Sequence, residues 1–485
     1  MGLHESVKKE LRTRLPFKNA FKEFPSLLDA RNAAHATREQ TVGCIDGNVI
    51  FRRIPRAVNT FDAYFHIVHN NLKNAIATSG VTVVVFDEPE VTTEAKRQEQ
   101  AARDAQSKSK NVVCSSDVAA MVAVPTDDNY TKADLLKVRD FEALVRHRPS
   151  RMRFFDELAV RVMERLKDQI ERWNRSGHFG GHVVFDGVDA RGADRPKGEP
   201  RARSVLASSE ALAQLFARDI DVGEGDLKLA HVGRRIRALA GAAEASPLKG
   251  ATLNLCTTTD TDSFAIELIQ EARRGGEPVT PANTLLCMRE QAKTAKRARE
   301  DNEEVTGQGY YTVCDVAMLH ALLQRHMWGP SRSPTPADQR AAMSLLAAGW
   351  GLARCDFVEL KPLRADVVHH CIGEIVKMHT DAVSEMRYAW EGDRTTLHRT
   401  HAPIKMLMAA CASRLLQLPR IHKENIPNVR SPDEIALKKI GWVVAYWNEV
   451  EHLDVAEFGF ADAVAATSGV HDGGADASAS AYSLG

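Results

Sequence analysis

Residues 251–262 read Ala-Thr-Leu-Asn-Leu-Cys-Thr-Thr-Thr-Asp-Thr-Asp. The run is mostly apolar at first and ends in Asp260 and Asp262, one residue apart. A short run of this kind predicts a buried strand that carries two carboxylates to the edge of a sheet. In an open α/β sheet, ligands bind at the carboxyl ends of the strands. The same residue types also suit a solvated turn, so the meaning of this pair depends on what the rest of the chain places beside it.

The chain has the size and composition of a globular protein with two or three domains. It contains 485 residues, of which 44% are hydrophobic, and 64 basic residues balance 64 acidic ones. Because the net charge is zero, a nucleic-acid partner has to be held by local basic patches and not by the overall field. The eight cysteines include no Cys-x-x-Cys pair. This usage indicates reduced thiols in an intracellular protein without a structural zinc site.

The sequence gives no sign of a membrane partner. No apolar run approaches the length of a membrane span, and the N-terminus has no signal-peptide core, so a soluble protein is expected. Residues 1–6 do fit the loose N-myristoylation pattern, which needs Gly2. A single acyl chain gives only marginal membrane binding, and another role for Gly2 is given below.

Two further acidic residues follow predicted strands near the N-terminus. Residues 42–51 form an apolar strand interrupted by Asp46, and residues 81–86 are a β-branched run followed by Asp87. Between them, Thr60 caps a predicted helix whose apolar positions recur with helical spacing. This strand, helix, strand order predicts a parallel pair with Asp46 and Asp87 at the same edge of a sheet.

Residues 1–40 are basic and irregular in pattern. After Asp87, predicted helices and short strands alternate along the chain. The further strands are residues 182–186 and 284–288, and the helices are residues 131–147, 151–174, 204–218, 341–351 and much of 366–460. The basic face of the 151–174 helix is either solvated or clamps a phosphate backbone. The last twenty or so residues are too poor in apolar side chains to pack, which predicts a disordered tail.

Seven acidic residues lie at a strand end or at a glycine-rich turn from a strand into a helix. They are Asp46, Asp87, Glu224, Asp226, Asp260, Asp262 and Asp356. If the fold gathers them, their mutual repulsion of several kcal/mol implies divalent cations. Ligation by oxygen alone selects Mg²⁺ or Mn²⁺ over Zn²⁺. Two such ions about 4 Å apart activate a water and stabilise the leaving oxygen of a phosphodiester, so the acids predict a metal-dependent hydrolase.

The order and type of these acids resemble the XPG and flap-endonuclease family of 5′ nucleases, a branch of the PIN-like fold. The matching motifs are Met1-Gly2-Leu3, Ile45-Asp46-Gly47, Val85-Phe86-Asp87 with Lys96 and Arg103, Glu224-Gly225-Asp226, Asp260-Thr261-Asp262 and Arg354-Cys355-Asp356-Phe357. The Gly-Glu-Gly-Asp sequence that ends at Asp226, and Phe185-Asp186-Gly187-Val188, are also similar to motifs of the related 5′-3′ exoribonucleases. Either Asp186 or Asp87 can therefore be the acid that corresponds to the second acidic strand of the family.

The resemblance implies a three-layer α/β/α nuclease domain of the PIN-like fold with a mostly parallel sheet, followed by a C-terminal helical region. The two parts of the nuclease domain are expected at residues 1–106 and 213–365. Between them, residues 107–212 are expected to hold a helical arch or insertion, which in the family passes a single-stranded 5′ end. Residues 366–462 form the expected helical region and residues 463–485 the disordered tail.

The resemblance also implies a DNA 5′ nuclease, of the flap-endonuclease or 5′-3′ exonuclease type, with two Mg²⁺ or Mn²⁺ ions held by the seven acids. Lys96 and Arg103 are then expected to face the scissile phosphate, and Arg97 and the processed N-terminal Gly2 to lie close to the nucleic acid. The implied partner is a nucleic acid with a free 5′ end or flap, DNA before RNA. A monomer is expected, located in the nucleus or at a site of DNA replication.

Departures from the family pattern leave alternatives open. Asp226 stands where the family has a Glu, the segment between Asp87 and Glu224 is long, and residues 358–365 replace the glycine-rich helix-hairpin-helix that holds duplex DNA. The tail contains no sliding-clamp peptide. The alternatives are an RNA nuclease of the same fold, a catalytically inactive nucleic-acid-binding scaffold, and a phosphatase that uses Asp260-Thr261-Asp262-Ser263 as an Asp-x-Asp signature.

Overall fold

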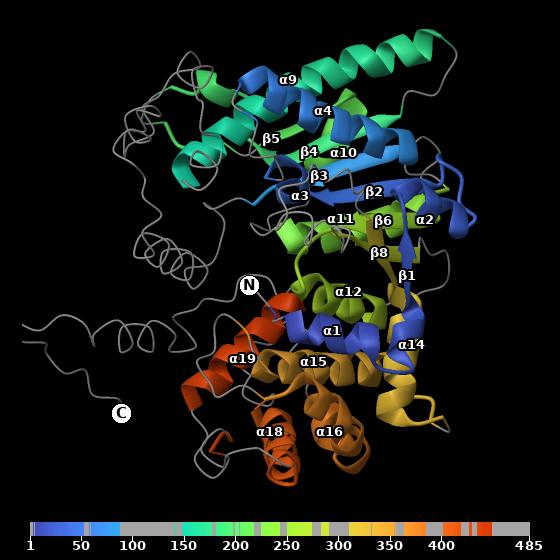
Figure 1. The fold of residues 1–485 in the computed structure, drawn as a ribbon, viewed down its shortest axis with the longest axis vertical. Helices are drawn as coiled ribbons and strands as arrows, with labels where there is room; N and C mark the ends of the chain where they lie inside the picture. The colour runs from blue at the N-terminus through green and yellow to red at the C-terminus, as the bar shows by residue number, and fades with distance from the viewer. Residues whose placement is uncertain are drawn as a thin grey trace, which may run out of the picture.

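The fold is that of a computed structural model of the whole chain (Figure 1). The residues that it describes are 3, 5–52, 58, 60–87, 141, 148–176, 181–196, 199–202, 204–217, 225–242, 250–273, 283–290, 310–330, 332–353, 355, 363–384, 401–418, 426–428 and 434–448.

One eight-stranded sheet runs through the fold (Figure 1). In spatial order its strands are β1 (Phe21–Phe24), β8 (Tyr310–Asp315), β7 (Asn283–Glu290), β6 (Leu253–Thr257), β2 (Thr41–Asp46), β3 (Val81–Val85), β4 (His182–Val188) and β5 (Ser204–Ala207). Strands β7, β6, β2, β3 and β4 are parallel, whereas β8, β1 and β5 run antiparallel to their neighbours. The fold is therefore α/β with a mostly parallel sheet, as predicted.

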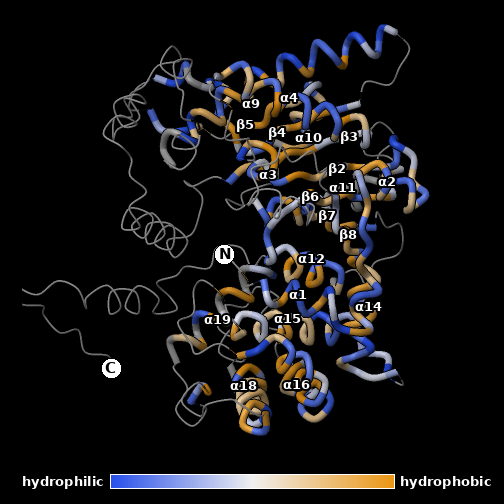
Figure 2. Tube along the Cα trace, viewed as in Figure 1, coloured by the Kyte–Doolittle hydropathy of each residue, from blue (hydrophilic) through white to orange (hydrophobic). Residues whose placement is uncertain are grey.

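Helices cover both faces of the sheet, which gives three layers. On one face lie α2 (Leu27–Ala33), α3 (Gly47–Phe51), α4 (Phe61–Thr78) and α9 (Arg148–Arg175). On the other lie α1 (Glu5–Thr13), α10 (Glu210–Ala217), α11 (Gly225–Ala242), α12 (Asp262–Arg273) and α14 (Val316–Trp328). Neighbouring residues of a strand point to opposite faces, so Cys44 packs in one apolar core and Ile45 in the other. Figure 2 shows hydrophobic residues along the central strands that both cores share.

The unit of β2, α4 and β3 follows the sequence pattern closely. The side chain of Thr60 accepts a hydrogen bond from the backbone N–H of Ala63 at 3.3 Å and caps α4. The apolar positions of α4 face the core, and Tyr64, Val68 and Leu72 are fully buried. All five residues of β3 are buried, as expected for a central parallel strand rich in valine.

In two short segments the structure has a different type of element from the one predicted. Residues 47–51, predicted to continue the strand before them, form α3, because the carboxylate of Asp46 accepts a hydrogen bond from the backbone N–H of Asn48 at 2.9 Å and caps a helix there. Residues 204–207, predicted to be helical, form β5, which pairs with β4 at the edge of the sheet. Helix α10 begins only at Glu210.

Residues 1–40 are more regular than predicted. They contain α1, a 3-10 turn η1 (Phe17–Ala20), β1 and α2. The buried side chains of α1 are Val7 and Leu11, four residues apart on one face of the helix. This short amphipathic pattern is the signal for a helix in the basic N-terminal segment.

The sheet draws strands from three of the divisions expected from the sequence. Strands β1, β2 and β3 come from residues 1–106, β4 and β5 from residues 107–212, and β6, β7 and β8 from residues 213–365. The 107–212 division is therefore not only a helical insertion, because its second half supplies two strands of the central sheet. Residues 107–140 and the expected tail at 463–485 lie outside the described residues.

The C-terminal half ends in helices packed against α12 and α14 (Figure 1). They are α15 (Pro336–Ala353), α16 (Ala365–Met378) and α19 (Glu434–Trp447), and α18 (His401–Leu416) packs against these three. Small residues let these helices approach closely: a Cβ atom at Gly349 would lie 2.6 Å from Val368 Cγ1 and 2.9 Å from Leu407 Cδ2. No described helix is long and apolar enough to cross a lipid bilayer.

A buried histidine joins two of these helices. Trp350 Nε1 of α15 donates a hydrogen bond to His369 Nε2 of α16 at 2.7 Å. Burial, and to a smaller extent the charge of Arg14, lowers the pKa of His369 to about 3. The ring is therefore neutral at pH 7, and Nε2 can accept the hydrogen bond from the indole N–H.

Candidate acidic site at the carboxyl edge of the sheet

The strand order reverses between β2 and β6. From β2 the chain moves outward to β3 and β4 on one side, and it later adds β6 and β7 on the other. Register pairs Asp46 with Val85 of β3 and Ile45 with Thr257 of β6, so these three strands end side by side. Such a reversal is the place where open α/β sheets bind ligands, and the segments that leave the sheet here carry Asp46, Asp87 and Asp260.

Asp46 is the last residue of β2 and is only 9% exposed. Gly47 follows it without room for a side chain, because a Cβ atom there would lie 2.5 Å from Cε1 of Phe86. Burial, then the charge of Asp87 and, less strongly, that of Asp260, raises the pKa of Asp46 to about 7, although the hydrogen bonds from Asn48 lower it. The carboxyl group of Asp46 therefore lies close enough to those of Asp87 and Asp260 for their charges to favour its protonated form.

Asp87 links the end of β3 to two other segments. Its Oδ1 accepts a hydrogen bond from the backbone N–H of Gly225 at 2.8 Å, and its Oδ2 accepts one from Asn48 Nδ2 at 3.4 Å. One turn into α11, the fully buried Lys228 donates from Nζ to the carbonyl oxygen of Phe86 at 2.8 Å. These contacts fix the start of α11 against the end of β3.

Asp226 lies at the start of α11, among the other acids. Its Oδ1 accepts a hydrogen bond from Ser263 Oγ at 3.0 Å, and Thr258 Oγ1 lies 3.5 Å from the same oxygen. The hydroxyl of Thr258 also accepts from the backbone N–H of Asp260 at 3.1 Å. Burial raises the pKa of Asp226 well above its ordinary value, and the charges of Asp260, Asp46 and Asp262 raise it further.

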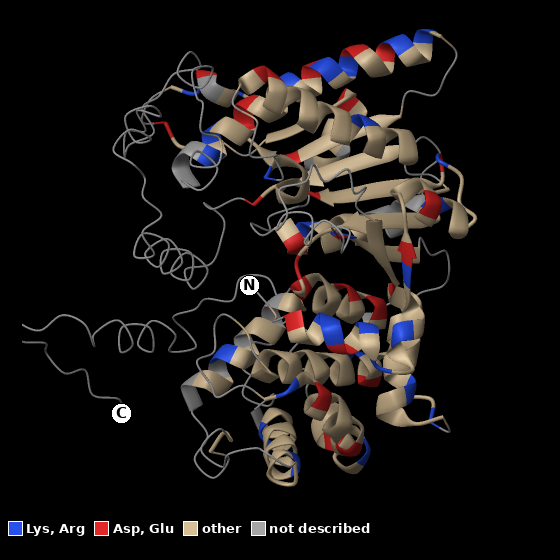
Figure 3. Cartoon of the chain, viewed as in Figure 1, with Lys and Arg blue, Asp and Glu red and all other residues tan. Residues whose placement is uncertain are grey.

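Asp262 brings Leu3 to the same place. It is 1% exposed, begins α12, and accepts a hydrogen bond from the backbone N–H of Leu3. Leu3 in turn forms an antiparallel bridge with Cys355. A carboxylate at the first turn of a helix is favoured by the helix dipole, and here it also holds the backbone of Leu3. Figure 3 shows acidic residues where α11 and α12 begin.

Five of the seven predicted acids therefore come together: Asp46, Asp87, Asp226, Asp260 and Asp262. Glu224 and Asp356 lie outside the described residues, but Gly225 and Cys355, their chain neighbours, make the contacts given above. The residues predicted to contact the nucleic acid also lie outside the described residues; they are Gly2, Lys96, Arg97 and Arg103.

Between the two candidates for the second acidic strand, Asp87 is the one beside Asp46. Its strand β3 is the direct neighbour of β2, and its carboxylate contacts Asn48 and Gly225. Asp186 lies one strand further out, within β4, where it faces Val85 in register and is fully buried.

The donors suit a hard cation in their chemistry. They are carboxylates, with the hydroxyl of Thr258 and the side-chain amide of Asn48 beside them, and oxygen ligands of this kind favour Mg²⁺ or Mn²⁺. Among the described residues, however, no three Asp, Glu, His or Cys side chains are placed to hold one ion. Mg²⁺ usually takes one or two carboxylates and completes its shell with water and substrate phosphates. The arrangement therefore fits such an open site better than a closed cage.

Several supporting residues were not predicted from the sequence. Asn48 and Ser263 each stand within two residues of a predicted acid, so a polar residue next to an acidic motif was a usable signal. Lys228 also stands two residues from Asp226, but its partner is a backbone carbonyl that any residue would supply, so the sequence does not indicate this contact.

Comparison with known proteins adds no relative. No model of a known protein family matches the chain, and no curated protein matches it. The function of the acidic site is therefore inferred from the motifs and from the geometry of the acids.

Proposed function

We propose that the protein is a divalent-metal-dependent nuclease of the PIN-like 5′-nuclease type, which hydrolyses phosphodiester bonds. The observation that carries the proposal is the meeting of five carboxylates, from different elements, at the point where the strand order reverses. Burial raises the pKa of Asp46 and of Asp226, and the repulsion between the acids raises it further. Bound cations would remove this repulsion, which is the usual reason for a protein to bury several acids together.

In this proposal each described acid has a ligand role, and four of the five also have a residue that orients the carboxylate. Asp46, Asp87, Asp226, Asp260 and Asp262 hold two Mg²⁺ or Mn²⁺ ions, together with Glu224 and Asp356 of the same motifs. Asn48 orients both Asp46 and Asp87, Ser263 orients Asp226, and the amide of Leu3 orients Asp262. When bound, the ions would supply an activated water and stabilise the leaving oxygen.

The proposed substrate is DNA with a free 5′ end or flap, with Lys96, Arg97, Arg103 and Gly2 against its backbone. The hydrogen bond between Leu3 and Asp262 supports a place for the N-terminus beside the substrate. RNA is the second candidate, because the exoribonuclease-like Phe185-Asp186-Gly187-Val188 motif lies on β4, the strand next to β3.

A cleavage assay on matched substrates tests the proposal. We expect the full-length protein to cut at least one of a 5′-flap duplex, a nicked duplex and a single strand, made in DNA and in RNA, with Mg²⁺ or Mn²⁺. Cleavage should stop when EDTA removes the ions, since the carboxylates alone cannot activate the water. Faster cutting of the RNA set would identify the RNA nuclease. Binding without cleavage in either metal would identify an inactive scaffold and refute the proposed enzyme.

A further inference from the structure

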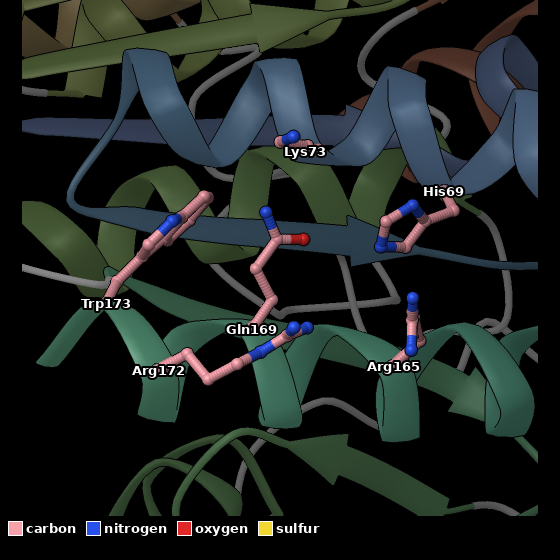
Figure 4. A pocket seen from close by; sticks show the side chains of 6 residues that line it. All are labelled: His69, Lys73, Arg165, Gln169, Arg172 and Trp173. Carbon is pink, nitrogen blue, oxygen red and sulfur yellow. The ribbon is translucent and has the colours of Figure 1, made fainter. Parts of the chain in front are cut away.

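A pocket with a basic wall lies between α4 and α9 (Figure 4). Its volume is about 320 Å³, and it is lined by His69 and Lys73 of α4 and by Arg165, Gln169, Arg172 and Trp173 of α9. Figure 4 shows Gln169 between Trp173 on one side and His69 and Arg165 on the other. The lining thus combines three cations, a neutral amide, an imidazole and an indole.

This pocket is separate from the acidic site. Helix α4 connects the parallel strands β2 and β3, so it runs from the carboxyl edge of the sheet back to the opposite edge. His69 and Lys73 lie from its middle onward, away from Asp46. Helix α9 leads into β4, which is parallel to β3 and begins at the edge of the sheet opposite the acids. Arg165 and Trp173 lie in the second half of α9, which approaches that edge. A ligand bound here would not contact the acids.

The positive charge of the pocket is not balanced by its own lining. No carboxylate lines it, and within the part of the chain that the structure describes, Lys73, Arg165 and Arg172 form no ion pair. Arg161, one turn earlier on α9, shows the contrast, since it pairs with Glu157 at 2.6 Å. Three uncompensated cations at one hollow favour an anion.

The other lining residues narrow the class of anion. Trp173 is half-buried and packs on the apolar core, which holds its indole in place. Burial lowers the pKa of His69, and the charges of Arg165 and Lys73 lower it further, although a hydrogen bond with Asn70 raises it, so the site favours the neutral ring. The buried Nε2 atom of this ring has no hydrogen-bond partner among the described residues. An indole stacks on a nucleobase, and a neutral ring nitrogen and an amide suit the polar groups of a base or sugar.

We propose that this pocket binds one nucleotide unit, with its phosphate between Lys73, Arg165 and Arg172 and its base against Trp173. Guanidinium groups bind phosphate oxygens through paired hydrogen bonds, and the volume is at the lower end of the range for small-molecule sites. The unit comes either from a free nucleoside monophosphate or from a single strand, which share this chemistry. The inference does not depend on the metal site.

Binding of three probes to the full-length protein in EDTA tests the inference: AMP, a twelve-residue single strand of dT, and inorganic phosphate. We expect Arg165→Gln and Lys73→Gln each to raise the Kd for the bound nucleotide probe by at least about tenfold, because each removes a charged hydrogen bond. Lys167→Gln, the same charge change on an exposed residue of α9 outside the pocket, should change the Kd by less than about twofold. Trp173→Leu should weaken AMP but not inorganic phosphate, provided its circular dichroism spectrum is unchanged.

The outcomes separate the sources of the nucleotide. AMP binding that Arg165→Gln weakens identifies a free nucleotide, and binding of the strand alone with the same variant pattern identifies a polynucleotide. For the strand, each lost cation should also reduce the dependence of log Kd on log salt by about one unit. The inference is overturned if neither AMP nor the strand binds, if Lys167→Gln weakens binding as much as Arg165→Gln, or if inorganic phosphate binds as tightly as AMP.

Discussion

Replacing Asp46 by Asn is expected to reduce Mg²⁺-dependent cleavage by about a hundredfold to a thousandfold. The change removes one charged ligand, and stabilisation of the transition state by a bound ion amounts to several kcal/mol. Asn caps helices as well as Asp does, so the hydrogen bond from the backbone N–H of Asn48 that begins α3 should survive. The loss of a charge repelled by Asp87 and Asp260 should leave the melting temperature without metal unchanged or higher. Initial rates and thermal unfolding measure the two effects.

Asp315→Asn is the matched control. Asp315 also ends a strand and also caps a helix, since its carboxylate accepts a hydrogen bond from the backbone N–H of Met318 at 3.0 Å. Strand β8 runs antiparallel to β7, however, so Asp315 lies at the opposite edge of the sheet. We expect this variant to cleave at the rate of the wild type. Equal activity of both variants would show that Asp46 holds no catalytic ion.

Replacing Arg201 by Ala is expected to lower the free energy of unfolding by about 3–5 kcal/mol, because it leaves a buried carboxylate without its cation. Arg201 and Asp156 are 4% and 2% exposed. The guanidinium donates to both carboxylate oxygens of Asp156, at 2.7 and 2.9 Å, and to the carbonyl oxygen of Gly187. Burial raises the pKa of Asp156 even though Arg201 lowers it, so loss of the cation adds to an existing cost. Urea unfolding followed by circular dichroism measures the change.

An exposed pair in the same protein provides the comparison for Arg201. Arg364 and Asp366 are also bidentate, but their side chains are 53% and 40% exposed. Arg364→Ala should therefore cost less than about 1 kcal/mol. The double change Asp156→Leu with Arg201→Met should recover most of the stability, because it removes both buried charges. If Arg201→Ala costs no more than Arg364→Ala, burial does not set the strength of these pairs.

Much of the fold could be predicted from the sequence where a pattern was long and regular. Helix α4 repeats its apolar residues over five turns, and β3 is an unbroken β-branched run, so both were placed correctly. The errors fall where a local contact or a tertiary partner decided the outcome. Asp46 caps α3 and ends the strand, and the four residues of β5 become a strand because they pair with β4. Neither event has a periodic signal.

The candidate site was predictable in part for a topological reason. Acids that follow parallel strands meet at one edge of the sheet, so the βαβ unit alone placed Asp46 near Asp87. Asp260 and Asp262 join the site because β6 lies next to β2. This strand order cannot be predicted from a local sequence motif. The hydrogen bonds from Leu3 to Asp262 and from Gly225 to Asp87 use backbone amides, which any residue would supply.

The acids at the place where the strand order reverses, between β2 and β6, are expected to bind divalent cations. Anomalous scattering from crystals of the full-length protein soaked in Mn²⁺ tests this binding most directly. We predict anomalous peaks about 2 Å from carboxylate oxygens of Asp46, Asp87, Asp226 or Asp260, with two ions about 4 Å apart when a substrate phosphate is present. Saturating Mn²⁺ that gives no peak at these residues, or peaks only at other parts of the surface, would contradict the account.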